Sequence, residues 1–284
     1  MFFDRPKYKQ FAKEQLSGRS LFPILITLIT LLISLALSTL QFEQIDTAEL
    51  TQYLASGDIE SASAYISSML KGIVGNLLVA LLTSAIGCII NYASITYYSE
   101  MTKSPEKVGF SVFVQGFNDW VRALGTGFYI ALRLFLWGLI LIAGAFVGLT
   151  LAIILVASFS IAGMPESVIL GVSITVFVII YLGSAVPYFI KMYAYSFTTY
   201  IAVENPHISI PNALTLSNKL TRGFKWSIFK LEFSFLPLIL LSLLLAGIPL
   251  LYIVPYMNLS KLNAYHAILR NAVDQKLLPE EIKE

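Results

Sequence analysis

The chain has 284 residues, of which 57% are hydrophobic and only 13% are charged, and its formal net charge is +2. Soluble domains carry about 25% charged residues, so this composition excludes an ordinary soluble domain, and its few basic residues exclude a nucleic-acid-binding protein. Several continuous apolar runs of about 20 residues predict an all-α, polytopic integral membrane helical bundle, whereas a β-barrel would need shorter alternating segments.

The first element is a basic, amphipathic segment at residues 1–20, with five Lys or Arg and two acidic residues. An apolar run follows at residues 21–40, and the positive-inside rule places segment 1–20 in the cytoplasm. The alternative is a cleaved signal peptide with its cleavage site near Ser38. Because the run is longer than the usual apolar core of about 7–15 residues, we interpret it as the first span.

Residues 41–70 contain five acidic residues and no Lys or Arg, which is typical of an external loop. The carboxylates lack the spacing of a calcium-binding loop, so we expect no cation site there. The membrane domain is expected to cover residues 21–271, and residues 272–284 to form a cytoplasmic tail. Its further spans are predicted at residues 73–98, 128–159, 168–203, 226–246 and 250–269.

The last of these spans is the most polar, and it leaves two topologies. With five spans the C-terminus lies outside, together with Lys261 and Arg270. With six spans both residues lie on the inner side, and both termini are cytoplasmic. The positive-inside rule favours about six spans in a cell membrane.

Three segments of interleaved polar and apolar residues end in glycine directly before a predicted span. They are residues 9–18, 111–125 and 212–223. Glycine is the usual residue where a helix ends and the chain turns. We therefore predict cytoplasmic interfacial elbow helices, each leading into a two-helix hairpin. Two interpretations stay open: an internal repeat, as in many transporters, or convergence, since the copies share few identical residues.

Four ionisable residues fall in the predicted cytoplasmic half of the bundle: Arg133, Lys191, Glu232 and Lys261. Charge within a membrane is costly, so this polar cluster is a functional hypothesis. It would form a positive pocket, open to the cytoplasm, that holds an anionic head group or solute. The alternative is that the long basic side chains reach the inner interface while Glu232 pairs locally.

No catalytic, cofactor-binding or metal-binding motif is present. The isolated His207 and His266 make a poor metal site, and the single cysteine, Cys88, is expected to pack between helices as a small residue. We therefore expect no catalytic residue, no metal, no cofactor and no enzymatic activity. An intramembrane enzyme built from scattered residues is a third, weaker alternative.

The last third of the chain carries a familiar pattern. It consists of Tyr200-Ile201-Ala202-Val203-Glu204-Asn205-Pro206, Ser217, Gly223-Phe224-Lys225-Trp226, Ser234-Phe235 and Pro255-Tyr256, and the opening Tyr8-Lys9 and Leu16-Ser17-Gly18 accompany it. These residues resemble the bacterial integral membrane family called domain of unknown function 975. The resemblance implies a multi-span protein of the bacterial inner membrane. It supplies no activity, substrate or catalytic residue, and the acidic segment 41–70 has no place in the pattern.

Two functions are compatible with the sequence. The favoured one is a non-enzymatic membrane component that binds lipid or a partner. Its expected partners are the lipid bilayer, anionic lipid head groups or a membrane protein, and no nucleic acid is expected. The alternative is a transporter or permease-like protein that uses the four-residue cluster as a pocket for an anionic ligand. A polar cavity that reaches the middle of the membrane would favour transport.

Overall fold

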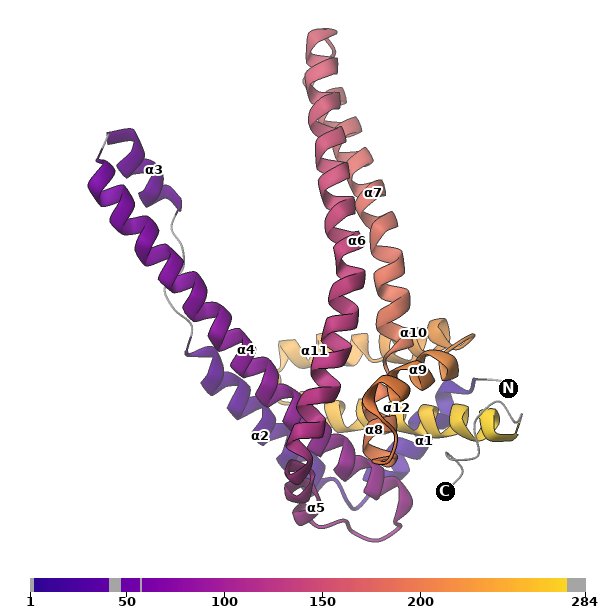
Figure 1. The fold of residues 1–284 in the computed structure, drawn as a ribbon. Helices are drawn as coiled ribbons and strands as arrows, with labels where there is room; N and C mark the ends of the chain where they lie inside the picture. The colour runs from indigo at the N-terminus through magenta and orange to yellow at the C-terminus, as the bar shows by residue number, and fades with distance from the viewer. Residues whose placement is uncertain (1–2, 41–46, 57, 275–284) are drawn as a thin grey trace.

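A computed structural model describes residues 3–40, 47–56 and 58–274, and this part of the chain is helical and contains no strand (Figure 1). The all-α class is therefore confirmed. In chain order the elements are α1 (Arg5–Leu16), α2 (Leu21–Ser38), α3 (Thr47–Ser56), α4 (Ile59–Lys103), α5 (Phe110–Gln115), the 3₁₀-helix η1 (Gly116–Asp119), α6 (Trp120–Ile161), α7 (Glu166–Ala194), α8 (Thr198–Glu204), α9 (Ile210–Leu220), α10 (Lys225–Phe233), α11 (Leu236–Leu244) and α12 (Leu250–Asp274).

The molecule consists of a packed base and two long arms that diverge from it (Figure 1). The first arm contains α2 and α4, with the short α3 at its tip. The second arm is the hairpin of α6 and α7, which turns at Gly163 and Pro165 as expected. A third hairpin, made of α10, α11 and α12, lies across the base. The base also holds α1, α5, α8 and α9.

Five helical segments of the described chain are long and apolar enough to cross a membrane, rather than the six expected. They are Leu21–Ser38, Ile59–Lys103, Phe110–Ile161, Glu166–Glu204 and Lys225–Leu244. The expected sixth span forms α12, whose 25 residues are not apolar enough to be counted with them. Polar residues such as Asn258 and Asn263 lower its hydropathy, and its second half packs into the base.

The segment expected as an external loop, residues 41–70, is largely helical instead. Residues 47–56 form α3 and residues 59–70 are the first turns of α4, while positions 41–46 and 57 lie outside the described residues. The carboxylate of Asp58 accepts the backbone N–H of Ser61 at 3.0 Å and so caps α4. Hydropathy showed only that this stretch is polar. A helix can begin at a capping residue such as Asp58 without any apolar run, so low hydropathy does not exclude a helix. Of the expected tail, residues 275–284 lie outside the description.

Two of the three expected glycine elbows are confirmed. Gly18 and Gly223 follow α1 and α9 with φ of +70° and +87°, a conformation that favours glycine. The elbow expected at Gly125 is wrong, because α6 runs through this residue. The α-helix is instead interrupted earlier, by the 3₁₀-helix η1. Glycine inside an apolar helix is tolerated where a neighbour approaches closely, and here the Ile210 side chain lies against Gly125.

The expected fourth span, residues 168–203, is also interrupted. α7 ends at Ala194 and α8 begins at Thr198, so a turn separates the two helices. This break brings α8 back into the base, where its residues are buried together with the last turns of α4. The largest fully buried side chains include Tyr92, Tyr97, Tyr98, Phe197 and Tyr265. The core of the protein therefore lies in the base, where large aromatic side chains are packed among aliphatic ones.

Small residues allow helices to approach each other closely. Gly127 of α6 lies against the sulfur of Cys88 in α4, so the expectation that Cys88 packs between helices is confirmed. Gly144 of α6 similarly faces Ser184 of α7. In both places a side chain on the glycine would collide with its neighbour. Contacts between small residues of this kind are how helices associate when lipid surrounds them.

Candidate functional site

Two of the four residues of the predicted polar cluster contact each other. Glu232 of α10 forms an ion pair with Lys261 of α12, with the carboxylate and ammonium 2.6 Å apart. The two side chains are 30% and 23% exposed, so the pair lies at the edge of the base. Each charge is largely neutralised by the other, and Glu232 pairs with Lys261 rather than with Lys225 or Lys230.

Arg133 and Lys191 lie on the lower part of the second arm, and each contacts an aromatic residue of α6. Arg133 is exposed on α6 and donates a hydrogen bond of 2.8 Å to the hydroxyl of Tyr129. Lys191 of α7 lies over the ring of Trp137, with its Nζ 4.6 Å from the ring centre. Both basic side chains therefore lie beside aromatic residues, as expected where long basic side chains meet a membrane interface.

Lys191 belongs to a second group of cations that we call the basic belt: Lys191, Arg222, Lys225 and Lys230. Lys225 is close enough to Lys191 and Arg222 to experience the positive charge of both. Lys230 lies 6.0 Å from the ring of Trp226, which is 66% exposed and stacks on Phe229 at 4.7 Å. Within the described chain no carboxylate forms an ion pair with these cations.

Ser217 of α9 fixes the geometry around the belt. Its hydroxyl donates to the carbonyl of Ala194 at 2.8 Å and accepts the backbone N–H of Phe197 at 3.1 Å. It thereby satisfies the two backbone groups on either side of the break between α7 and α8. Because Ser217 is fully buried, these bonds tie α9, and the belt residues that follow it, to the end of α7.

A buried polar group, which the sequence did not single out, joins three separate helices. Oε1 of Glu204 in α8 accepts the hydroxyl of Ser99 in α4 at 2.6 Å and lies 2.8 Å from Nε2 of His266 in α12. His266 appeared in the sequence as an isolated histidine, because its partner Glu204 is 62 residues away in the chain. The only sequence signal was the position of Glu204 in the Glu-Asn-Pro motif.

Arg122 stabilises the end of α8 from the side of α6. Its guanidinium donates to the carbonyls of Ala202, Asn205 and Ile208 at 3.1, 3.1 and 2.7 Å. The carbonyl of Ala202 also accepts the hydroxyl of Tyr92 at 3.1 Å. The carbonyls of Ala202 and Asn205 lie at the C-terminal end of α8, where helical N–H partners run out, and that of Ile208 lies in the link to α9, so an arginine from a neighbouring helix supplies donors to all three. Glu204 is therefore held in a rigid part of the base.

Comparison with known proteins gave one finding. No curated protein and no solved structure matches the chain. A family model described as "Protein of unknown function (DUF975)" matches residues 1–272, which include both arms, the base and the acidic segment 41–70. The family expected from the two ends of the chain is thus confirmed over its middle as well. The chain belongs to this family of proteins of unknown function.

Proposed function

We propose that the protein is a multi-pass membrane component without enzymatic activity, which binds anionic lipid at the basic belt and exposes its arms to lipid or to partner helices. The observation that carries this proposal is the exposure of the arms. The most apolar 18-residue windows of the five candidate spans are only 11–22% buried. Side chains such as Leu78 and Phe146 are 62% and 68% exposed, and apolar surface on this scale needs a hydrocarbon environment or a partner.

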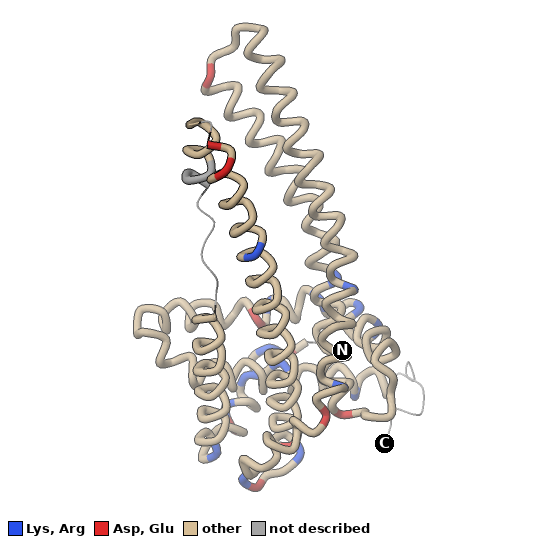
Figure 2. The backbone as a smooth tube through the Cα atoms, turned by 60° about the vertical axis from the view of Figure 1, so that its left-hand side comes forward, with Lys and Arg blue, Asp and Glu red and all other residues tan. Residues whose placement is uncertain are grey.

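The distribution of charge supports an orientation with the base in the cytoplasm (Figure 2). Lys and Arg lie in the base and on the lower ends of the arms, apart from Lys71 on α4. At the tips the charged residues are acidic, among them Glu60 and Glu166 in the first turns of α4 and α7, and the other described acidic residues lie in the base among the Lys and Arg (Figure 2). The first and last helices, α1 and α12, both lie in the base (Figure 1). The positive-inside rule then gives cytoplasmic termini in a cell membrane, which for this bacterial family is the inner membrane.

The basic belt is suited to anionic head groups because its cations have no acidic partner and are flanked by aromatic rings. Each Lys or Arg near an anionic membrane surface contributes about 1 kcal/mol to binding. An exposed tryptophan such as Trp226 is typical of the membrane–water interface. The belt lies at the lower end of the second arm, where this orientation places the inner leaflet.

Transport has less support. The pocket that the transport hypothesis requires would need Arg133 and Lys191 beside Glu232 and Lys261, yet Glu232 and Lys261 pair with each other and Arg133 is exposed on α6. The two arms diverge above the base (Figure 1), so within the described chain they do not surround a path across the membrane. A single copy with this arrangement fits a binding component better than a permease.

The test is lipid retention by the purified full-length protein in nanodiscs of phosphatidylcholine with 20% phosphatidylglycerol, measured by native mass spectrometry. We expect bound phosphatidylglycerol, and a loss on the order of tenfold or more in the triple variant Lys191→Gln, Arg222→Gln, Lys225→Gln. The matched control is Arg5→Gln, Lys13→Gln, Lys107→Gln, which removes the same charges from exposed positions elsewhere. Equal retention by the two variants would refute the proposal.

A further inference from the structure

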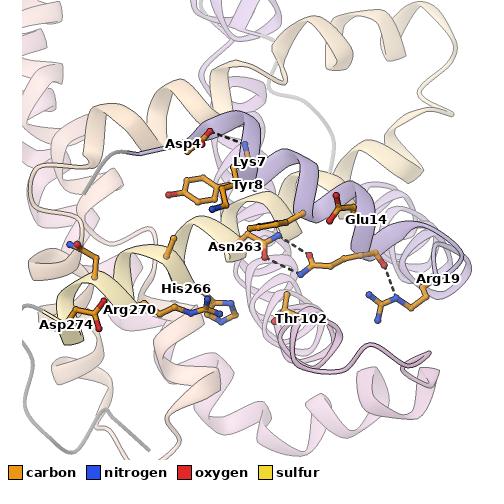
Figure 3. A pocket seen from close by; sticks show the side chains of 14 residues that line it. Asp4, Lys7, Tyr8, Glu14, Arg19, Thr102, Asn263, His266, Arg270 and Asp274 are labelled. Atoms are coloured by element: carbon orange, nitrogen blue, oxygen red, sulfur yellow. Dashed lines mark hydrogen bonds between the residues drawn. The ribbon is translucent and has the colours of Figure 1, made fainter.

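A cleft of about 790 Å³ in the base is lined by residues of both α1 and α12, which pack against each other (Figure 3). Its volume lies within the usual range of small-molecule sites, about 300–1,000 Å³. The first and last helices of the chain provide most of its lining. None of the residues of the basic belt lines it. Residues from α1, α4 and α12 form its walls, among them Phe11, Arg19, Thr102, His266, Ala267 and Arg270.

One end of the cleft is rigid. The amides of Gln15 in α1 and Asn263 in α12 bond to each other reciprocally, at 3.2 and 2.9 Å (Figure 3). Arg19 is fixed beside them, because its Nε donates to the carbonyl of Gln15 and its Nη1 donates to the carbonyls of Ser104 and Glu106. All of these acceptors are neutral carbonyls. The positive charge of Arg19 is therefore held at the cleft without a counter-ion.

His266 enters the same end of the cleft from α12 in a fixed orientation. An ionised carboxylate can only accept hydrogen bonds, so the contact with Glu204 places a proton on Nε2 of the ring. The other ring nitrogen is left to the cleft, where the side chain is 19% exposed. A histidine whose ring is oriented in this way by a buried carboxylate is typical of a ligand-binding or proton-transferring site.

Arg270 lies four residues after His266, so the two side chains are on the same face of α12. Arg270 is exposed, and no carboxylate of the described chain forms an ion pair with it. Three acidic residues also line the cleft. Asp4 and Glu14 each have an oxygen engaged on α1, with the N–H of Lys7 and the amide of Gln10, and Asp274 lies one turn beyond Arg270.

The remaining wall is apolar and neutral. Phe11 and Ala267 line it from α1 and α12, next to Tyr8. Burial raises the pKa of Tyr8, so this residue adds no negative charge near neutral pH. A ligand that fits both walls carries an anionic group at one end and an organic part at the other.

We propose that this cleft binds an organic phosphate, with the phosphoryl group held by His266 and Arg270 in the field of Arg19 and the organic part packed against Phe11 and Ala267. Guanidinium groups bind phosphoryl oxygens through two parallel hydrogen bonds. His266 adds a third donor in its protonated form, in which Nε2–H stays on Glu204 and Nδ1–H faces the phosphoryl oxygen. The phosphoryl group could belong to a soluble phosphate monoester or to the head group of a phospholipid. The cleft recognises the chemistry that the two share.

The experiment uses the full-length protein in nanodiscs and has one assay for each source. In the first assay, sn-glycerol 3-phosphate is titrated calorimetrically into the protein in phosphatidylcholine nanodiscs. In the second assay, retention of phosphatidic acid is measured by native mass spectrometry with the basic belt already removed by Lys191→Gln, Arg222→Gln and Lys225→Gln. Each assay compares Arg270→Gln with Lys13→Gln, which replaces an exposed lysine of α1 that does not line the cleft.

We expect binding in at least one assay. Arg270→Gln should weaken the affinity about tenfold or more, because a hydrogen bond to a charged group contributes that much to binding, and Lys13→Gln should leave the affinity unchanged. Binding of glycerol 3-phosphate identifies a soluble ligand, and binding of phosphatidic acid alone identifies a head group. Absence of binding in both assays, or equal binding by the two variants, would overturn the proposal. Because the protein used in the second assay lacks the charges of the basic belt, this outcome is independent of the lipid test described under the proposed function. Arg270 is exposed, so its replacement leaves the fold intact.

Discussion

The carboxylate of Glu232 in α10 lies 2.6 Å from the ammonium group of Lys261 in α12, although the residues are 29 positions apart. This ion pair joins α10 to α12 within the third hairpin. It also removes two of the four charges that a positive membrane pocket would need. The pair is thus a structural contact in this arrangement, and its removal has a measurable signature.

Glu232→Ala should destabilise the protein more than the double variant Glu232→Ala, Lys261→Ala. The single substitution leaves the half-buried Lys261 without a partner, whereas the double substitution removes both charges. We expect a coupling energy of about 1 kcal/mol, between the values of exposed and fully buried pairs. Thermal unfolding of the four proteins of the cycle in detergent measures it. Additive effects of the two substitutions would show that the pair contributes nothing.

Ser217→Ala should destabilise the base by about 1–3 kcal/mol, because it leaves the buried N–H of Phe197 without a hydrogen bond. Thr215→Ala is the matched control, since Thr215 is exposed on the same helix and bonds only to the carbonyl of Pro211. Denaturant unfolding in detergent compares the two variants. If Ser217→Ala unfolds at the same denaturant concentration as Thr215→Ala, the break between α7 and α8 does not depend on Ser217.

Gly127→Ala should destabilise the contact between α4 and α6, because the added methyl group collides with the sulfur of Cys88. Overpacking of this kind costs about 1–3 kcal/mol. Gly87→Ala, in α4, is the control: no atom lies within 4 Å of the new side chain, and alanine favours a helix by about 1 kcal/mol over glycine. Unfolding temperatures should therefore move in opposite directions. A shift of the same sign in both variants would contradict the close approach of α4 and α6.

Single cysteines placed at Ser56 and Ser17, in a Cys88→Ala background, test the orientation. Ser56 ends α3 at the tip of the first arm and Ser17 follows α1 in the base, and both are exposed. In intact cells a membrane-impermeant maleimide should label the cysteine at position 56 and not the one at position 17. After the membrane is permeabilised, both should react. Labelling of position 17 in intact cells would place the base outside.

The sequence by itself determined the helical class and the positions of the apolar segments and of several turns. Hydropathy is a local property, so it located the apolar segments that became α2, α4, α6, α7 and α10–α11. Glycine and proline are equally local, and they marked the turns at Gly18, Gly163 and Gly223, where a positive φ is required. The family motifs were legible because they are continuous in the chain.

Only the tertiary structure decided which polar residues meet. Glu204 gains His266 and Ser99 as partners through contacts between α8, α12 and α4, and no periodicity in the chain brings these positions together. Hydropathy also could not show that α3 and the start of α4 are helical, because a polar helix and a polar loop have the same composition. The continuation of α6 through Gly125, which lies against Ile210, likewise depends on a contact between distant residues. These features arise from contacts between distant residues, so they exist only once the chain has folded.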